Sequence, residues 1–267
     1  MNGREVNGRR MDALAVCVPG LLEARADDVL PLASVGKLLL LAEIARQIAD
    51  GKLDPEEKPG VAAEDYSGGS GLLADLSPQR WTLADLVRFT AAVSDNTATN
   101  ALIRRIGLER INEGAEELGL RRTRILDRIR EPRLPQHPPT FARGTARELA
   151  ALATRVAGPE PWSRTMLSWL AANTDRSMVA AAVPHDPEDR DVPEAADRTD
   201  AAGPRGILWL ANKTGTDTGT RADVGVVRGV RDVAYAVIGT CEPDGEYELV
   251  RAMRAVGLLI GRAASGS

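Results

Sequence analysis

Ser34-Val35-Gly36-Lys37-Leu38-Leu39-Leu40-Leu41-Ala42-Glu43-Ile44-Ala45 opens a nearly continuous apolar stretch that runs to Ile48. Its apolar side chains surround the helix axis on almost every side, which is typical of a helix buried inside a protein. Asp50-Gly51 follows as a stop signal, since glycine commonly ends helices. We therefore predict a helix over residues 35–48 that lies in the interior.

The chain on the C-terminal side of this helix is typical of further helices. Trp81–Val93 has Thr82 as a candidate N-cap and apolar residues at helical spacing. Ser94-Asp95-Asn96 interrupts this pattern before the next helix begins. The remaining predicted helices of this block are Thr97–Ile106, Leu108–Leu118, Thr140–Val156 and Trp162–Ala171.

Strand-like sequence lies at both ends of the chain, rich in Val, Ala and Ile. Strands at the two ends must pair across the helical block, which predicts one sheet built from both termini. We expect an α/β fold with residues 1–33 and 200–267 in one lobe, an all-α lobe over 34–183, and an acidic, proline-bearing loop over 184–204. The predicted strands are 11–19, 21–32, 206–213, 222–228 and 232–240, and a closing helix is predicted over 247–260.

Composition argues against several classes of partner. The net charge is −4 and aromatic residues make up 3% of the 267 residues, whereas nucleic acid and anionic membranes favour a basic face. Cys17 and Cys241 lie in apolar strand-like runs, which predicts buried thiols on neighbouring strands and leaves a disulfide open. We expect a monomer that acts on a small molecule. The sequence as written has no apolar leader, which predicts a cytoplasmic protein, or a secreted one if a leader was trimmed.

Two lysines stand out because the chain has only four lysines against thirty arginines. Arginine stays charged in proteins, whereas a desolvated lysine can lose its proton. Lys37 stands three residues after Ser34, so the two side chains share a face if a helix begins at Ser34. A serine hydroxyl needs a neighbouring base to become a nucleophile, and a neutral Lys37 can be that base. The alternative is a chance Ser-x-x-Lys on a helix.

Two more motifs follow in order. Ser94-Asp95-Asn96 lies at a break between helices, where an ordinary capping turn is the alternative. Lys213-Thr214-Gly215-Thr216 ends a predicted strand, and Gly215 lets a substrate approach the backbone closely if this is an edge strand. Ser-x-x-Lys, Ser-Asp-Asn and Lys-Thr-Gly in this order form a known signature. Through these motifs the sequence resembles class A β-lactamases and penicillin-binding proteins over residues 12–262, which implies a β-lactamase-like fold.

The resemblance also implies a role for each residue. Ser34 is the expected nucleophile, and Lys37 is its base. Ser94 relays a proton to the leaving nitrogen, and Asn96 holds the amide carbonyl of the substrate. Lys213 and Thr214 are expected to bind the substrate carboxylate beside Gly215. The backbone N–H groups of Ser34 and Thr216 are expected to form an oxyanion hole. Arg221 is expected to clamp the same carboxylate, and the alternative is that it is a solvated arginine on a strand.

No metal or organic cofactor is implied by this resemblance. His137 and His185 lie in proline-rich segments without the spacing of metal ligands.

The loop Asp127–Pro135, inside the helical block, departs from the family pattern. Glu131-Pro132 matches the expected base for deacylation, but Pro135 replaces an asparagine that would help to hold water. Glu131 is therefore a candidate general base, with a surface carboxylate paired to a flanking arginine as the alternative. We expect a class A-type β-lactamase. The rival hypotheses are a cytoplasmic esterase, amidase or acyl transferase on the same fold, and a penicillin-binding protein that acylates without efficient deacylation.

Overall fold

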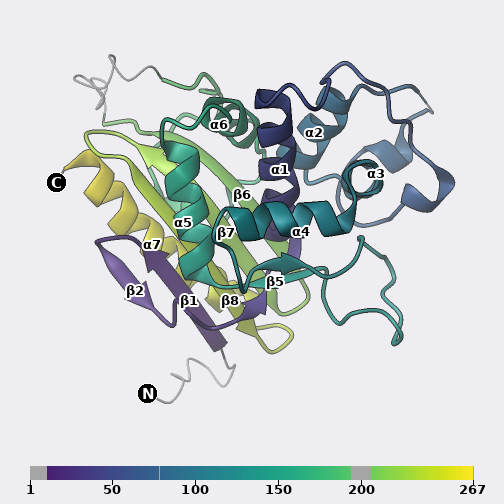
Figure 1. The fold of residues 1–267 in the computed structure, drawn as a ribbon. Coiled ribbons are helices and arrows are strands. Elements are labelled where there is room, and N and C mark those ends of the chain that lie inside the picture. Colours follow the sequence, from purple (N-terminus) through teal and green to yellow (C-terminus); the bar gives the residue numbers. More distant parts are fainter. Residues whose placement is uncertain (1–10, 78, 194–205, 267) are drawn as a thin grey trace.

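A computed structural model describes residues 11–77, 79–193 and 206–266. Five antiparallel strands form its main sheet in the order β2-β1-β8-β7-β6, so strands from the two chain ends pair through β1 and β8 (Figure 1). This confirms the predicted α/β fold with one sheet built from both termini. The strands are β1 Met11–Val18, β2 Leu22–Ala24, β6 Trp209–Asp217, β7 Thr220–Arg228 and β8 Val233–Cys241.

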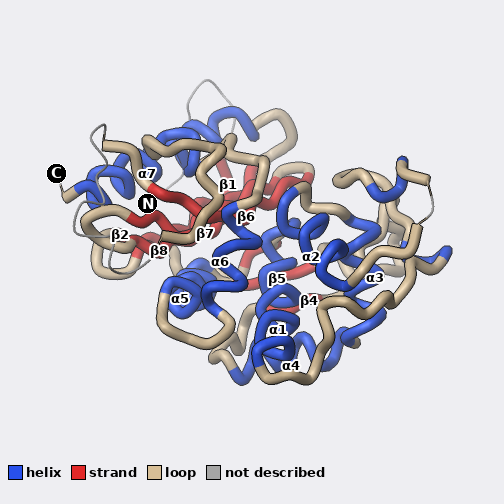
Figure 2. The backbone as a smooth tube through the Cα atoms, turned by 90° about the horizontal axis from the view of Figure 1, so that it is seen from above, coloured by secondary structure: helices blue, strands red, loops and turns tan. Residues whose placement is uncertain are grey.

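Residues on the two faces of this sheet belong to two separate apolar cores. Along β7, Ala222, Val224 and Val226 pack with the helical block, whereas Val227 faces the core shared with the C-terminal helix α7. This alternation follows from the two-residue period of a strand. The sheet is therefore the middle layer between α7 on one side and the other helices on the other side (Figure 2).

Helix α1, Lys37–Ala49, lies at the centre of the helical block and packs on α2, α3, α4 and α6. Nine successive residues from Lys37 to Ala45 are buried, which confirms the predicted interior helix. It ends at Asp50, followed by Gly51 with a φ of +68°. The other helices are α2 Leu83–Ala92, α3 Asn96–Ile106, α4 Leu108–Glu117, α5 Ala146–Ala157, α6 Ser163–Ala171 and α7 Glu246–Ser265, and the 3-10 turns are η1 Ala33–Gly36, η2 Ala63–Asp65, η3 Leu73–Asp75 and η4 Val179–Ala182.

The helix predicted over Thr140–Val156 begins only at Ala146. Thr145 has extended backbone angles, and its hydroxyl accepts a hydrogen bond from the Glu148 N–H, so it is the N-cap. The residues before it form β5, Ala142–Gly144, in a second sheet with β3, Leu30–Pro31, and β4, Arg124–Ile125. The prediction was wrong for residues 140–145 because the strands that pair with them are distant in sequence.

Two other features of the fold bear on the sequence predictions. Cys17 and Cys241 are buried, free thiols on the adjacent strands β1 and β8. Residues 194–205 of the predicted acidic loop lie outside the described residues. The part of that loop before them contacts the sheet, since His185 bridges to Leu208 and the Pro193 carbonyl accepts a hydrogen bond from Arg228. Among the described residues, no helix is both long and apolar enough to cross a membrane.

Two glycines on α7 provide a matched test of how tightly this helix packs. A Cβ at Gly257 would lie 2.3 Å from the Val179 carbonyl oxygen, whereas a Cβ at Gly261 would make an ordinary 3.4 Å contact with Pro184. We expect Gly257→Ala to lower the free energy of unfolding by about 1–3 kcal/mol through overpacking. Gly261→Ala should raise it by about 0.5–1 kcal/mol, because alanine favours helix. Urea denaturation of both variants checks this, and equal midpoints would contradict it.

Candidate active site

Ser34 lies on η1, the short turn that leads directly into α1. Its side chain is half-buried and lines two cavities, of about 120 Å³ and about 170 Å³. Ser70 and Thr216 also line both cavities, so Ser34 stands where the two hollows adjoin. The hydroxyl is thus accessible to a small molecule from either side.

Lys37 is fully buried one helical turn after Ser34. Its Nζ donates hydrogen bonds to the Ser94 carbonyl at 2.6 Å, the Ser94 Oγ at 3.1 Å and the Asn96 Oδ1 at 2.9 Å. Burial holds the pKa of this amine well below its ordinary value, the positive charge of Lys213 lowers it further, and Asp95 opposes the shift. A neutral amine in this position can accept a proton.

The Ser94-Asp95-Asn96 loop is fixed by hydrogen bonds on both sides. Asp95 is the N-cap of α3 through the Ala98 N–H, and its other oxygen accepts from the N–H groups of Leu72 and Leu73, both at 2.7 Å. The Asn96 amide donates to the Gly68 carbonyl at 2.7 Å. These contacts hold Ser94 and Asn96 against the amine of Lys37.

The Lys213–Thr216 segment forms the wall of the site that comes from β6, an edge strand. Lys213 is fully buried, and burial lowers its pKa to about 8 while Asp175 and Asp223 act to raise it. A Cβ at Gly215 would lie 2.6 Å from the Leu32 carbonyl oxygen and 3.1 Å from the Ser34 nitrogen. Glycine is therefore required for β6 to approach the turn that carries Ser34.

Glu131 lines the smaller cavity together with Ser34 and Asn96. Its carboxylate is exposed and makes no hydrogen bond or ion pair with the described residues. Two of the flanking arginines are engaged elsewhere: Arg130 pairs with Asp127, and Arg128 donates to the Glu64 carbonyl. The structure therefore does not show the alternative, in which the Glu131 carboxylate is paired with these arginines.

Arg221 lies away from the two cavities. Its guanidinium donates to the carbonyl oxygens of Asp217 and Thr220, at 2.7 and 2.8 Å, in the turn between β6 and β7. It is among the lining residues of neither cavity. The structure thus brings together nine of the ten predicted site residues and leaves Arg221 at the adjacent turn, where its backbone contacts hold the side chain.

Two groups at the site were missed by sequence reasoning. Asn100, one helical turn after Asn96 on α3, exchanges two hydrogen bonds with the backbone of Ile129, at 2.8 and 2.9 Å, and so anchors the loop that carries Glu131. Asn173 and Asp175 line the larger cavity beside Thr214. The signal for Asn100 was its spacing of four from Asn96, which places both on one helix face.

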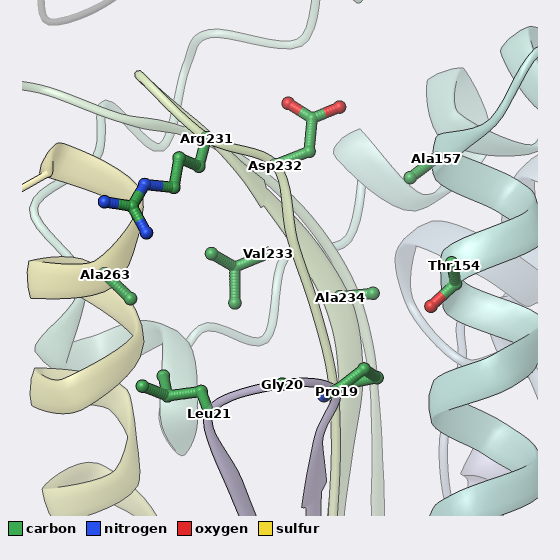
Figure 3. Close-up of a pocket in the computed structure, with 10 residues that line it drawn as sticks. All are labelled: Pro19, Gly20, Leu21, Thr154, Ala157, Arg231, Asp232, Val233, Ala234 and Ala263. Atoms are coloured by element: carbon green, nitrogen blue, oxygen red, sulfur yellow. The ribbon is translucent and has the colours of Figure 1, made fainter.

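Another cavity, of about 360 Å³, lies at a distance from these residues (Figure 3). The turn of Pro19, Gly20 and Leu21 lies there between α7 and α5, and none of the predicted catalytic residues lines the cavity. Among the described residues, no cluster of three or more His, Cys, Asp or Glu could hold a metal ion.

A family model described as the Beta-lactamase enzyme family matches residues 19–264. A β-lactamase from Sphaerobacter thermophilus is 26% identical, with a TM-score of 0.73 and coverage of 94% of this chain and 88% of that chain. No curated protein matches the sequence.

Two further solved structures share the fold at lower identity. PBP-A is 19% identical, with a TM-score of 0.76 over 95% of this chain and 89% of that one. An ancestral (GNCA) class A β-lactamase is 23% identical, with a TM-score of 0.74 over 94% of each chain. These two likenesses show the fold.

The buried amine of Lys213 should reduce stability at neutral pH. Because the folded-state pKa is about 8 and the ordinary value is 10.5, the unfolded chain binds more protons between these pH values, and stability rises with pH across that window. We expect Lys213→Met to raise the free energy of unfolding at pH 7 by about 1–3 kcal/mol and to weaken the rise with pH. Denaturation from pH 7 to 10 measures both. The exposed Lys52, changed to Met, is the control, and a pH slope unchanged in Lys213→Met would contradict this expectation.

Proposed function

The chain belongs to the beta-lactamase enzyme family and is a serine hydrolase of the class A β-lactamase type, and we propose that Ser34 is its nucleophile. The observation that carries this proposal is the position of Lys37: a fully buried amine, one helical turn from Ser34 and hydrogen-bonded to Ser94. Burial lowers the pKa of this amine and so favours the neutral form, which can accept a proton.

Acylation then needs only groups that line the two cavities or contact Lys37. The Ser34 Oγ attacks the lactam carbonyl carbon while its proton passes to the neutral Lys37 amine. Lys37 returns a proton through the Ser94 Oγ, 3.1 Å away, to the lactam nitrogen as the carbon–nitrogen bond breaks. The product is an ester on Ser34 with an opened ring, and the N–H groups of Ser34 and Thr216 stabilise the oxyanion in between.

Substrate binding is proposed for the remaining residues. Lys213 and Thr214 bind the carboxylate of the substrate, and the amide of Asn96 orients its carbonyl. A buried ammonium group that keeps its charge attracts an anion strongly because the local dielectric is low.

Deacylation is proposed to proceed through Glu131. Its carboxylate accepts a proton from a water molecule that attacks the Ser34 ester, and the proton then returns to the Ser34 oxygen. The position of Glu131 in the cavity of Ser34, without a partner among the described residues, supports this role. The family match does not favour the esterase, amidase and acyl-transferase hypotheses, or a penicillin-binding protein that remains acylated.

Ser34→Ala should abolish acylation. We expect hydrolysis of a chromogenic cephalosporin to fall by about 10³-fold or more and no acyl adduct to appear in the intact mass. Ser70→Ala is the matched control because Ser70 lines the same two cavities, and it should retain most of the activity. Turnover by Ser34→Ala at the wild-type rate would disprove the assignment.

Glu131→Gln should separate the two halves of the reaction. Acylation should persist while deacylation slows by about 10²–10⁴-fold, so a burst is followed by a weak steady state and the adduct accumulates on Ser34. Asp217→Asn, which changes another carboxylate lining the cavity, should show neither effect. An unchanged steady-state rate in Glu131→Gln would exclude Glu131 as the base.

A further inference from the structure

Behind the strand that carries Lys213 lies a buried carboxylate that the proposed mechanism does not use. Asp223, on β7, is fully buried. Its Oδ1 accepts hydrogen bonds from the Asn212 amide at 2.9 Å and the Tyr235 hydroxyl at 3.0 Å, and its Oδ2 accepts from the Val179 N–H at 2.9 Å. It forms no ion pair with the described residues. Burying a carboxylate costs free energy unless it is paired or hydrogen-bonded.

Hydrogen bonds connect this carboxylate to the wall of the active site. Asn212, which precedes Lys213, accepts from the Arg176 guanidinium at 2.8 Å and from the Asn173 amide at 3.0 Å. Asn173 lines the larger cavity of Ser34 and accepts a hydrogen bond from the Asp175 N–H. A chain of three side chains, Asp223, Asn212 and Asn173, therefore runs from the sheet interior to the substrate cavity.

The charges around Lys213 give this connection a chemical consequence. Burial acts to remove the proton of Lys213, while Asp175 and Asp223 are the two carboxylates that favour its charged form. Asp223 itself faces Tyr235 on β8, Arg176 in the segment before η4, and Asp175 and Lys213 at the site. A lysine that binds a carboxylate must be protonated to do so.

We propose that Asp223 is a positioning residue for substrate binding: its carboxylate fixes Asn212 behind the β6 strand and keeps the adjacent Lys213 amine charged for an anionic substrate. This inference rests on the proposed role of Lys213. It assigns to Asp223 an effect on KM for substrates that bear a carboxylate, without contact between Asp223 and the reacting atoms.

The small number of lysines makes the charge of Lys213 directly measurable. With ¹³C-labelled lysine, only four side chains titrate, and the ¹³Cε resonance reports the protonation of each. In the wild type we expect the Lys213 midpoint near pH 8. Removing the nearby negative charge in Asp223→Asn should lower that midpoint by about half to one pH unit. A midpoint that does not move overturns the proposal.

Tyr235→Phe is the matched control. It removes one hydrogen bond to the same carboxylate at 3.0 Å but no charge, so it should lower stability without moving the Lys213 midpoint. A midpoint lowered equally in Tyr235→Phe would show a purely structural effect and overturn the proposal. If Asp223→Asn fails to fold, the same lysine titration of the wild type tests the proposal. Burial raises the pKa of Asp223 to about 6, so protonation of Asp223 should shift the Lys213 resonance between pH 5 and 7. A Lys213 resonance that does not change over this range overturns the proposal.

Kinetics then connect the charge to binding. At pH 8, Asp223→Asn should raise KM for a carboxylate-bearing cephalosporin by about 2- to 5-fold, in proportion to the lost fraction of charged Lys213, with kcat changed less than about twofold. The alkaline limb of kcat/KM should move to lower pH by the amount seen in the lysine titration. If no variant or wild type turns over any β-lactam, the proposed function fails; if turnover occurs but the limb stays in place, only the role of Asp223 fails.

Discussion

Two ammonium groups buried in one small site, those of Lys37 and Lys213, set the constraint on which the rest of the structure depends. Both side chains are fully buried, and each positive charge makes the other harder to keep. The surroundings of the two lysines affect their pKa values differently. Lys37 donates its hydrogen bonds to Ser94 and Asn96 and to no carboxylate, and its pKa lies well below the ordinary value. Asp175 and Asp223 instead hold Lys213 nearer to its charged form. One lysine can then be a base and the other an anion receptor.

The architecture follows from bringing these two lysines together. Lys37 must begin a helix that is apolar on nearly all sides, because a base with a lowered pKa needs a dry environment. That helix in turn needs other helices around it, and these are the α2, α3, α4 and α6 that cover it. Lys213 arrives from the far end of the chain on an edge strand, and Gly215 allows that strand to touch the turn before α1. The insertion of a helical block between strands is the topology that makes this contact possible.

Features set by local sequence could be predicted, and those set by distant partners could not. The apolar helix after Ser34, the five-stranded sheet and the three motifs followed from periodicity, spacing and resemblance. Residues 140–145 were assigned to a helix because β5 exists only through pairing with β3 and β4. Asn212, Asp223 and Tyr235 gave no signal either, since a polar residue in a strand usually faces solvent, and only the fold shows that these three satisfy one another.

The loop of Glu131 shows how a base can be held although the sequence departs from the family pattern. Pro135 offers no side-chain polar group to hold water, but the loop is fixed by Asn100 of α3 on the Ile129 backbone and, within the loop, by the Asp127–Arg130 ion pair. That ion pair has a second effect. Arg130, which lines the same cavity as Glu131, is engaged by Asp127 at 2.5 Å and makes no ion pair with Glu131. The carboxylate therefore keeps its lone pairs available for a water molecule in the cavity of Ser34.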